Sequence, residues 1–192
     1  LAIATLMVFG ACASKNPNFN GARSHHTPEG FQNLYAAKHP GGFWKWKRDQ
    51  WREGLPKKPD GGYKFPLLKP DANFLASNRA ESTMTWIGHA TLLLQMKGVN
   101  ILTDPHFSGR ASPVDFAGPK RVVPAAMSID ELPPIDVVVI SHNHYDHLDV
   151  PTVRRLAQSG THFFVPLGIA AHLERWGVPA TQFTELDWWQ SA

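Results

Sequence analysis

The sequence contains a single cysteine, Cys12. One thiol excludes an intramolecular disulfide framework, and it also excludes a cysteine-rich zinc site within this chain. The imbalance between basic and acidic residues is small, since 19 Lys and Arg against 16 Asp and Glu give a net charge of +3 with the histidines neutral. Because this charge is mild and no recognition motif accompanies it, nucleic acid is not an expected partner.

Long apolar runs are also missing, and the chain does not begin with methionine. Residues 1–11 are uncharged and apolar, but a run of about a dozen residues is too short to span a bilayer and is typical of a signal-peptide core. Small residues precede Cys12 as in a bacterial lipobox, although Phe9 fits that pattern imperfectly. We therefore expect 1–12 to be a signal-peptide remnant with Cys12 as the lipidation site. A plain signal peptide, or a buried strand with an incidental cysteine, is the alternative.

Lipidation at Cys12 would place the protein in the bacterial cell envelope, as an outer-membrane lipoprotein or in the periplasm. The membrane surface would then be a partner through the lipid anchor, because a lipoprotein that carries several acyl chains attaches stably. The oligomeric state is not predicted by the sequence.

Residues 13–80 are rich in Pro, Gly, Asn and aromatic residues and show no sustained hydrophobic period, so we expect an irregular N-terminal extension. Within it, a helix at 43–54 would place Trp44 and Trp51 on one face among basic residues. Tryptophan beside lysine and arginine is typical of a segment at a membrane interface. Packing of this helix onto the main domain is the alternative that we favour.

From residue 81 to residue 192, β-branched runs alternate with turn residues and then with short helical patterns. Strands are expected at 83–87, 90–96, 99–103, 135–141, 162–165 and 182–186. Lys97 and Gly98 predict a tight hairpin. One helix is expected with Pro151 in its first turn and Asp149 as its cap, and another begins at Ile169. Strands first and then strand–helix alternation indicate an α/β layered domain.

The segment 141–149 is the most informative part of the chain, because its residues 142–149 include three imidazoles and two carboxylates. It follows the apolar run 135–140, which reads as a buried strand bounded upstream by two prolines. The segment therefore lies at the carboxyl end of a strand, where open α/β sheets usually bind their ligands.

Imidazole and carboxylate groups suit Zn²⁺ and similar divalent ions. Four of them at H-x-H-x-D-H spacing do not all face one ion comfortably. His142 and His144 can converge from one side of the loop, while Asp146 and His147 point toward a second ion. The alternative is a set of ordinary surface histidines. The spacing favours half of a two-metal hydrolytic site, with the four side chains converging on one cavity.

This H-x-H-x-D-H pattern after an apolar strand resembles the signature of the metallo-β-lactamase superfamily. Further segments resemble its N-acyl-phosphatidylethanolamine phospholipase D branch: TWIGHAT at 85–91, LTDP at 102–105, RASP at 110–113, GPKR at 118–121 and ELDWW at 185–189. The resemblance covers about residues 80–192. It implies that 81–192 form the first half of an αββα sandwich, truncated here. A further His, a bridging Asp and a last His are then expected downstream.

The resemblance also implies roles for single residues. His142 and His144 would bind the first of two Zn²⁺ ions, Asp146 and His147 would bind the second, and Asp146 would also handle a proton. Asp104 would support the loop from the neighbouring strand end. His89 would line the site, or would be hydrogen-bonded without a catalytic duty. The remaining histidines, His106 among them, carry no predicted role.

The implied activity is phospholipase D-type hydrolysis of N-acylphosphatidylethanolamine by the full-length protein, whereas the 192-residue piece alone is expected to be inactive. Another hydrolase of this fold, acting on a lactone or a small phosphodiester, is the alternative within enzymes. A metal-binding envelope protein without turnover is the alternative outside them.

Overall fold

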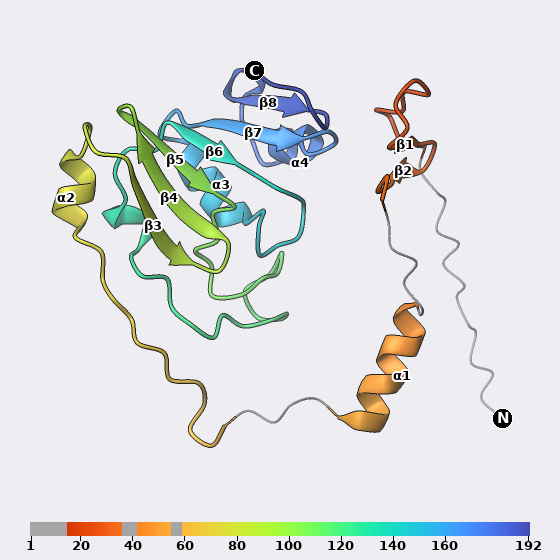
Figure 1. Cartoon of the computed structure of the whole chain (residues 1–192), viewed down its shortest axis with the longest axis horizontal. Coiled ribbons are helices and arrows are strands. Elements are labelled where there is room, and N and C mark those ends of the chain that lie inside the picture. Colours follow the sequence, from red (N-terminus) through yellow and green to blue (C-terminus); the bar gives the residue numbers. More distant parts are fainter. Residues whose placement is uncertain (1–14, 36–41, 55–58) are drawn as a thin grey trace. The chain divides into compact units, whose positions relative to one another are not determined.

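A computed structural model describes residues 15–35, 42–54 and 59–192 of the chain. The chain divides into two units, Leu1–Lys57 and Lys58–Ala192, whose described helices and strands are labelled in Figure 1. Cys12 and the expected signal-peptide remnant lie outside the described residues, so both stay predictions. In the described part, no helix combines the length and the apolar character needed to traverse a bilayer.

The described residues of the first unit form a short hairpin and a helix. Strands β1 (His26–Thr27) and β2 (Gly30–Phe31) pair antiparallel, and helix α1 spans Phe43–Glu53. The helix expected at 43–54 is confirmed, and an exposed Lys45–Asp49 ion pair at 2.7 Å links one turn of it to the next. Trp44 and Trp51 are exposed, and the role of this helix at an interface or in packing stays a prediction.

The second unit is built on a six-stranded sheet in the order β3-β4-β5-β6-β7-β8. Its first three strands, β3 (Thr83–Gly88), β4 (Thr91–Met96) and β5 (Val99–Thr103), form an antiparallel meander. Strands β6 (Val137–Val139), β7 (His162–Pro166) and β8 (Phe183–Leu186) continue from β5 in parallel. The helices are α2 (Ala72–Ser77), α3 (Val150–Ala157) and α4 (Ala170–Arg175), with 3-10 turns η1 at Ile129–Glu131 and η2 at Ala180–Gln182. The α/β fold class is therefore confirmed.

The hairpin between β4 and β5 turns as expected. Lys97 and Gly98 both have positive φ angles, 52° and 78°, which is the conformation of a type I′ turn. Glycine adopts it without strain, and the right-handed twist of the flanking strands favours it.

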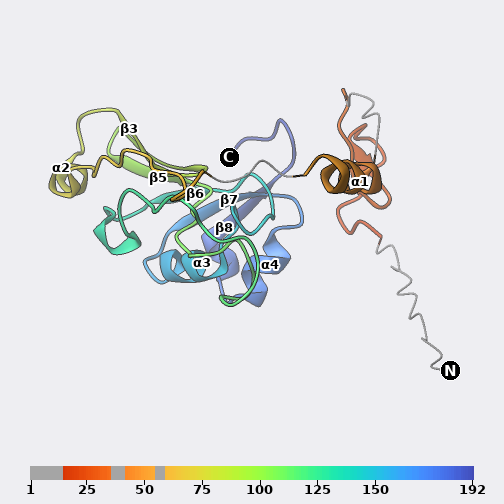
Figure 2. The same cartoon turned by 90° about the horizontal axis from the view of Figure 1, so that it is seen from below.

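Helices α3 and α4 cover one face of the sheet (Figure 2). The side chains that point toward them are fully buried, among them Leu93, Leu102 and Phe163 at 0% exposure. On the opposite face Trp86 is 63% and Val139 is 41% exposed. The buried strand expected over 135–141 is confirmed in part: β6 spans only Val137–Val139, and one of its two faces is exposed.

Asp149 occupies the N-cap position of α3, but its side chain makes no hydrogen bond to the helix backbone. The predicted cap is wrong in this respect. The buried carboxylate instead accepts hydrogen bonds from Phe107 N at 3.2 Å, Ser108 N at 3.1 Å, Ser108 Oγ at 2.7 Å and the Thr152 hydroxyl. Asp149 therefore fastens the segment after β5 to the start of α3.

Replacing Asp149 with alanine is expected to lower the free energy of unfolding by about 3 kcal/mol, because buried donors would lose a charged acceptor. Urea titration measures the change. The matched control is Asp71→Ala at the N-cap of α2, where the carboxylate accepts from Asn73 N and Phe74 N at 3.0 Å on an exposed surface. That loss should cost about 1 kcal/mol. Equal effects of the two substitutions would contradict the role given to Asp149.

Candidate metal centre

The 141–149 loop starts from a fixed point in the sheet. Asp104 N donates to Val139 O at 2.9 Å, and Ile140 N donates to Phe164 O at 3.0 Å, so the loop leaves β6 between two paired strands. Further along, Leu148 N donates to His144 O at 2.7 Å. Leu148 itself is only 2% exposed and anchors the far end of the loop in the core. Both ends of the loop are therefore held by the fold.

The first pair of imidazoles lies at the start of this loop. His142 Nε2 and His144 Nδ1 are 3.1 Å apart, and their ring centroids are 4.7 Å apart in an edge-to-face arrangement. Two nitrogens at this separation can both reach one ion at the usual Zn–N distance of about 2.0–2.1 Å. The geometry of this pair fits the first ion expected from the sequence.

The second group combines a carboxylate with two imidazoles. Asp146 Oδ2 lies 2.8 Å from His89 Nε2 and 3.4 Å from His147 Nε2. One donor atom from each of these residues lies within 4.8 Å of the others, as holding one ion requires. Since an ionised carboxylate only accepts hydrogen bonds, His89 donates its Nε2–H to Asp146 in this arrangement. The sequence placed Asp146 and His147 together but did not place His89 against Asp146.

Asp104 fixes the tautomers of two loop histidines. Its Oδ2 accepts from His147 Nδ1 at 3.0 Å and from Ser141 Oγ at 2.7 Å, while its Oδ1 accepts from Ser141 N at 2.7 Å. The Ser141 hydroxyl donates its one hydrogen bond to Asp104, so its oxygen accepts the hydrogen bond from His142 Nδ1–H at 2.8 Å. His147 and His142 therefore both present an Nε2 lone pair, which is the form that binds a metal.

Two residues of the centre have strained backbones. His89 and Asp104 have φ angles of 54° and 37°, in the left-handed region that non-glycine residues seldom adopt. Strain of this kind costs about 1–3 kcal/mol per residue and clusters at functional sites. His89 and Asp104 both hydrogen-bond to residues of the 141–149 loop.

The electrostatics of the loop favour the metal-binding protonation states. Burial, followed by repulsion from His147 and His144, holds the pKa of His142 below its ordinary value, so its lone pair stays available at neutral pH. Burial alone would raise the pKa of Asp146. Hydrogen bonds from its own backbone amide and from His89, with attraction from His147, outweigh burial and keep that pKa below its usual range.

A cavity of about 420 Å³ opens beside this cluster and is lined by Asp146 and His89. The four loop side chains expected to converge form one connected group: His142 Nε2 lies 3.1 Å from His144 Nδ1, the His142 ring centroid lies 4.1 Å from that of His147, and His147 Nε2 lies 3.4 Å from Asp146 Oδ2. Of the four, only Asp146 lines this cavity.

Two residues of this cavity were missed in the sequence. His106 is only 4% exposed, and its Nδ1 accepts from Arg121 at 2.8 Å while its Nε2 donates to Arg110 O at 3.3 Å. Burial comes first among the causes that lower the pKa of His106. The available signals were its place two residues after Asp104 and the position of Arg121 in the GPKR segment.

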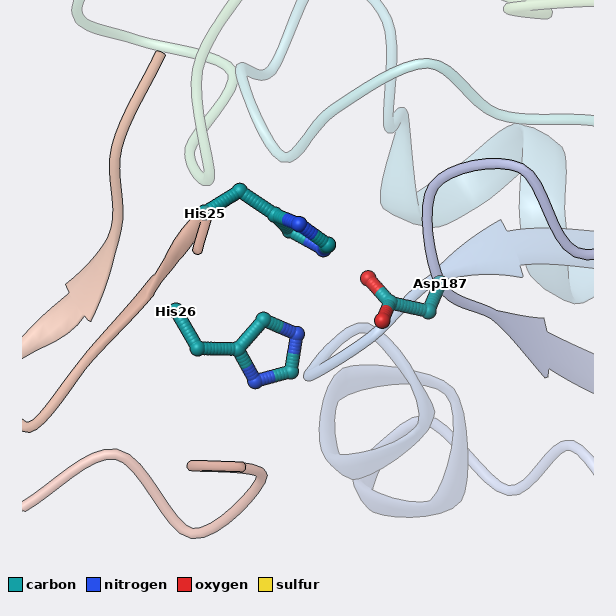
Figure 3. A group of neighbouring side chains, drawn as sticks. All are labelled: His25, His26 and Asp187. Atoms are coloured by element: carbon teal, nitrogen blue, oxygen red, sulfur yellow. The ribbon is translucent and has the colours of Figure 1, made fainter. Parts of the chain in front are cut away.

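The acidic residues near the end of the chain have structural partners. Glu185 Oε1 accepts from Gly168 N at 2.7 Å and from Ala170 N at 2.8 Å, so it satisfies amides at the start of α4. Asp187 Oδ1 accepts from Trp188 N at 2.8 Å within a turn. Figure 3 labels Asp187 together with His25 and His26, whose rings meet edge to face at 4.6 Å in the other unit. No site is assigned to these three residues.

Comparison with known proteins agrees with this picture. Residues 99–192 match the family described as the Beta-lactamase superfamily domain. An uncharacterized protein of Mycobacterium tuberculosis is 47% identical over 129 residues, which are 67% of this chain and 34% of that protein. The N-acyl-phosphatidylethanolamine-hydrolyzing phospholipase D 1 of Caenorhabditis elegans is 43% identical over 113 residues, 56% of this chain and 32% of that protein.

A third relative is a metal-dependent hydrolase of Methanopyrus kandleri, 43% identical over 65 residues, which are 34% of this chain and 23% of that protein. The chain spans 34% or less of the length of these three relatives.

The α/β fold, the histidine-rich loop at a strand end and these matches define one class: the chain belongs to the metallo-β-lactamase superfamily. Its relatives include the N-acyl-phosphatidylethanolamine-hydrolyzing phospholipases D of Caenorhabditis elegans and Saccharomyces cerevisiae. These matches support the resemblance found in the sequence.

Proposed function

We propose that the full-length protein is a metal-dependent hydrolase that cuts N-acylphosphatidylethanolamine in the manner of a phospholipase D. Water would add to phosphorus, and the bond from phosphorus to the ethanolamide oxygen would break. The products are phosphatidic acid and an N-acylethanolamide. The observation that carries the proposal is the histidine–aspartate loop held by Asp104, and the phospholipase D of Caenorhabditis elegans, 43% identical over 113 residues, supports the choice of substrate.

The donor set fits two Zn²⁺ ions. His142 with His144 would hold one ion, and Asp146 with His147 would hold the other, all through imidazole and carboxylate donors that zinc accepts. When bound, the ions would polarise the phosphate oxygens and activate a water molecule.

The remaining work falls to the chain's own side chains. Asp146 lines the cavity and is ionised at neutral pH, so it can accept the proton that the attacking water gives up. The 2.8 Å hydrogen bond from His89 holds that carboxylate at the cavity wall. Delivered to the departing alkoxide oxygen, the proton would complete the N-acylethanolamide and return Asp146 to its ionised form.

The test uses the full-length product of the gene, stripped of metal and then reloaded with Zn²⁺. We expect metal-dependent release of both products from vesicles that contain N-acylphosphatidylethanolamine. In water enriched in heavy oxygen, the label should appear in phosphatidic acid, since attack at phosphorus puts the water oxygen there. A protein that binds zinc but releases neither product would contradict the proposal, and so would turnover of lactones alone.

A further inference from the structure

The cavity beside the metal centre has two chemically different sides. Its wall is largely apolar and includes Trp86, Pro119 and Val122, with Trp86 held by a 2.9 Å hydrogen bond from its Nε1 to His89 O. Two consecutive cations, Lys120 and Arg121, also line it. A cavity of this kind suits a ligand with a negative group next to an apolar chain.

Arg121 is built into the cavity wall. Its guanidinium donates to Ser108 O at 3.3 Å, to His106 Nδ1 at 2.8 Å and to the His106 carbonyl. Burial lowers its pKa, with attraction from Asp149 acting against the shift, but a guanidinium stays protonated in proteins. Because most of its N–H groups already donate to residues of the loop, Arg121 contributes a fixed positive charge and part of the cavity wall. Few of its donors are left for a ligand.

Lys120 is placed differently. Its backbone is fixed by an antiparallel bridge to Arg110, while its side chain is exposed. Within the described residues, no carboxylate lies within ion-pair distance of its ammonium group. Lys120 also lines a neighbouring cavity of about 750 Å³, whose other charged residues are Arg110, Arg154 and one acid, Asp115. Its ammonium can therefore turn to an anion in either cavity without breaking an ion pair of the described residues.

We propose that Lys120 is the residue that recognises the anionic group of the substrate: a phosphate oxygen attached to an apolar chain that lies against Trp86. This inference deepens the proposed function and rests on it for the identity of the substrate. The binding chemistry itself, a cation in the lining of a largely apolar cavity, requires only that an amphiphilic phosphate enters. Arg121 contributes a positive potential around the anionic group, and Lys120 makes the direct contact with it.

The kinetic experiment compares Lys120→Met, Lys120→Arg and a control, Lys97→Met, in the full-length zinc-loaded protein with a short-chain N-acylphosphatidylethanolamine. Lys97 is an exposed lysine at the β4–β5 turn, and it does not line the cavity. Lys120→Met is expected to raise KM about tenfold, the loss of one charge-assisted hydrogen bond, with kcat within about twofold. Lys120→Arg and Lys97→Met should stay near the parent protein. An unchanged KM for Lys120→Met would overturn the inference.

A binding experiment separates this inference from the proposed function. Dissociation constants are measured for dihexanoyl phosphatidic acid, for the neutral dihexanoylglycerol with the same chains, and for inorganic phosphate without chains. Lys120→Met should weaken phosphatidic acid about tenfold and leave dihexanoylglycerol unchanged. If this pattern holds although no phosphodiester is hydrolysed, the proposed function fails and the role of Lys120 stands. Equal affinity of parent and variant for phosphatidic acid would sink the role of Lys120 even in an active enzyme.

Discussion

Replacing His144 with alanine is expected to remove one zinc equivalent from the full-length protein and to lower phosphodiester hydrolysis by a hundredfold or more. His144 Nδ1 lies 3.1 Å from His142 Nε2, so its loss leaves the first ion with one imidazole from this loop. Even changes in the partners of metal ligands cost about 10–100-fold, and the loss of a ligand costs more. Metal content per protein and initial rates are measured on the same preparations.

The matched control is His172→Ala. His172 belongs to α4, and its ring packs on Trp176 at a centroid distance of 5.7 Å. Its substitution removes an imidazole of the same size without touching the donor set. Full zinc content in His144→Ala, or an equal loss in His172→Ala, would contradict the assignment of His144 to the metal.

The second large effect is expected at Asp104. Alanine there should weaken zinc binding about 10–100-fold and destabilise the fold by about 2–4 kcal/mol. The substitution removes the acceptor of the Ser141 N, Ser141 Oγ and His147 Nδ1 hydrogen bonds. It also places an alanine at a φ of 37°, where glycine and asparagine are better tolerated.

Two further substitutions separate the causes. Asp104→Gly relieves the backbone strain but loses all three hydrogen bonds, so its zinc affinity should match that of the alanine variant. Asp104→Asn tolerates the φ angle and keeps one acceptor oxygen, so its affinity should fall between those of parent and alanine. Nitrogen NMR of the imidazoles gives a readout independent of activity: His142 and His147 should be Nδ1–H tautomers in the parent and mixtures in Asp104→Ala. Unaltered tautomers in that variant would show that Asp104 does not set them.

The strands and the metal loop were predictable because each rests on local pattern. The β-branched runs gave β3, β4, β5 and β7 to within one residue of their observed bounds, and Lys97-Gly98 marked the turn between β4 and β5. The cluster of His142, His144, Asp146 and His147 was visible because all four residues lie within one loop.

Features that depend on distant parts of the chain were not predictable in the same way. His89 and Asp146 are separated by 57 positions, and only the pairing of β3 through β6 brings their side chains to 2.8 Å. Asp149 matched the local pattern of a helix cap, but its carboxylate accepts hydrogen bonds from Phe107 and Ser108 in place of the helix backbone. The exposed face of β6 was missed because an apolar run has the same appearance whether one face or both are covered.

The hydrogen bonds between Asp104 and the end of β6 have a consequence for the flexibility of the site. Asp104 N donates a hydrogen bond to Val139 O, and the Asp104 carboxylate accepts one from Ser141 N, so we expect Asp104 and the start of the loop to move together. The loop then loses little conformational entropy when a metal ion binds, because it is already ordered when the chain folds. The amides of 139–141 should accordingly exchange with solvent as slowly before metal loading as after it.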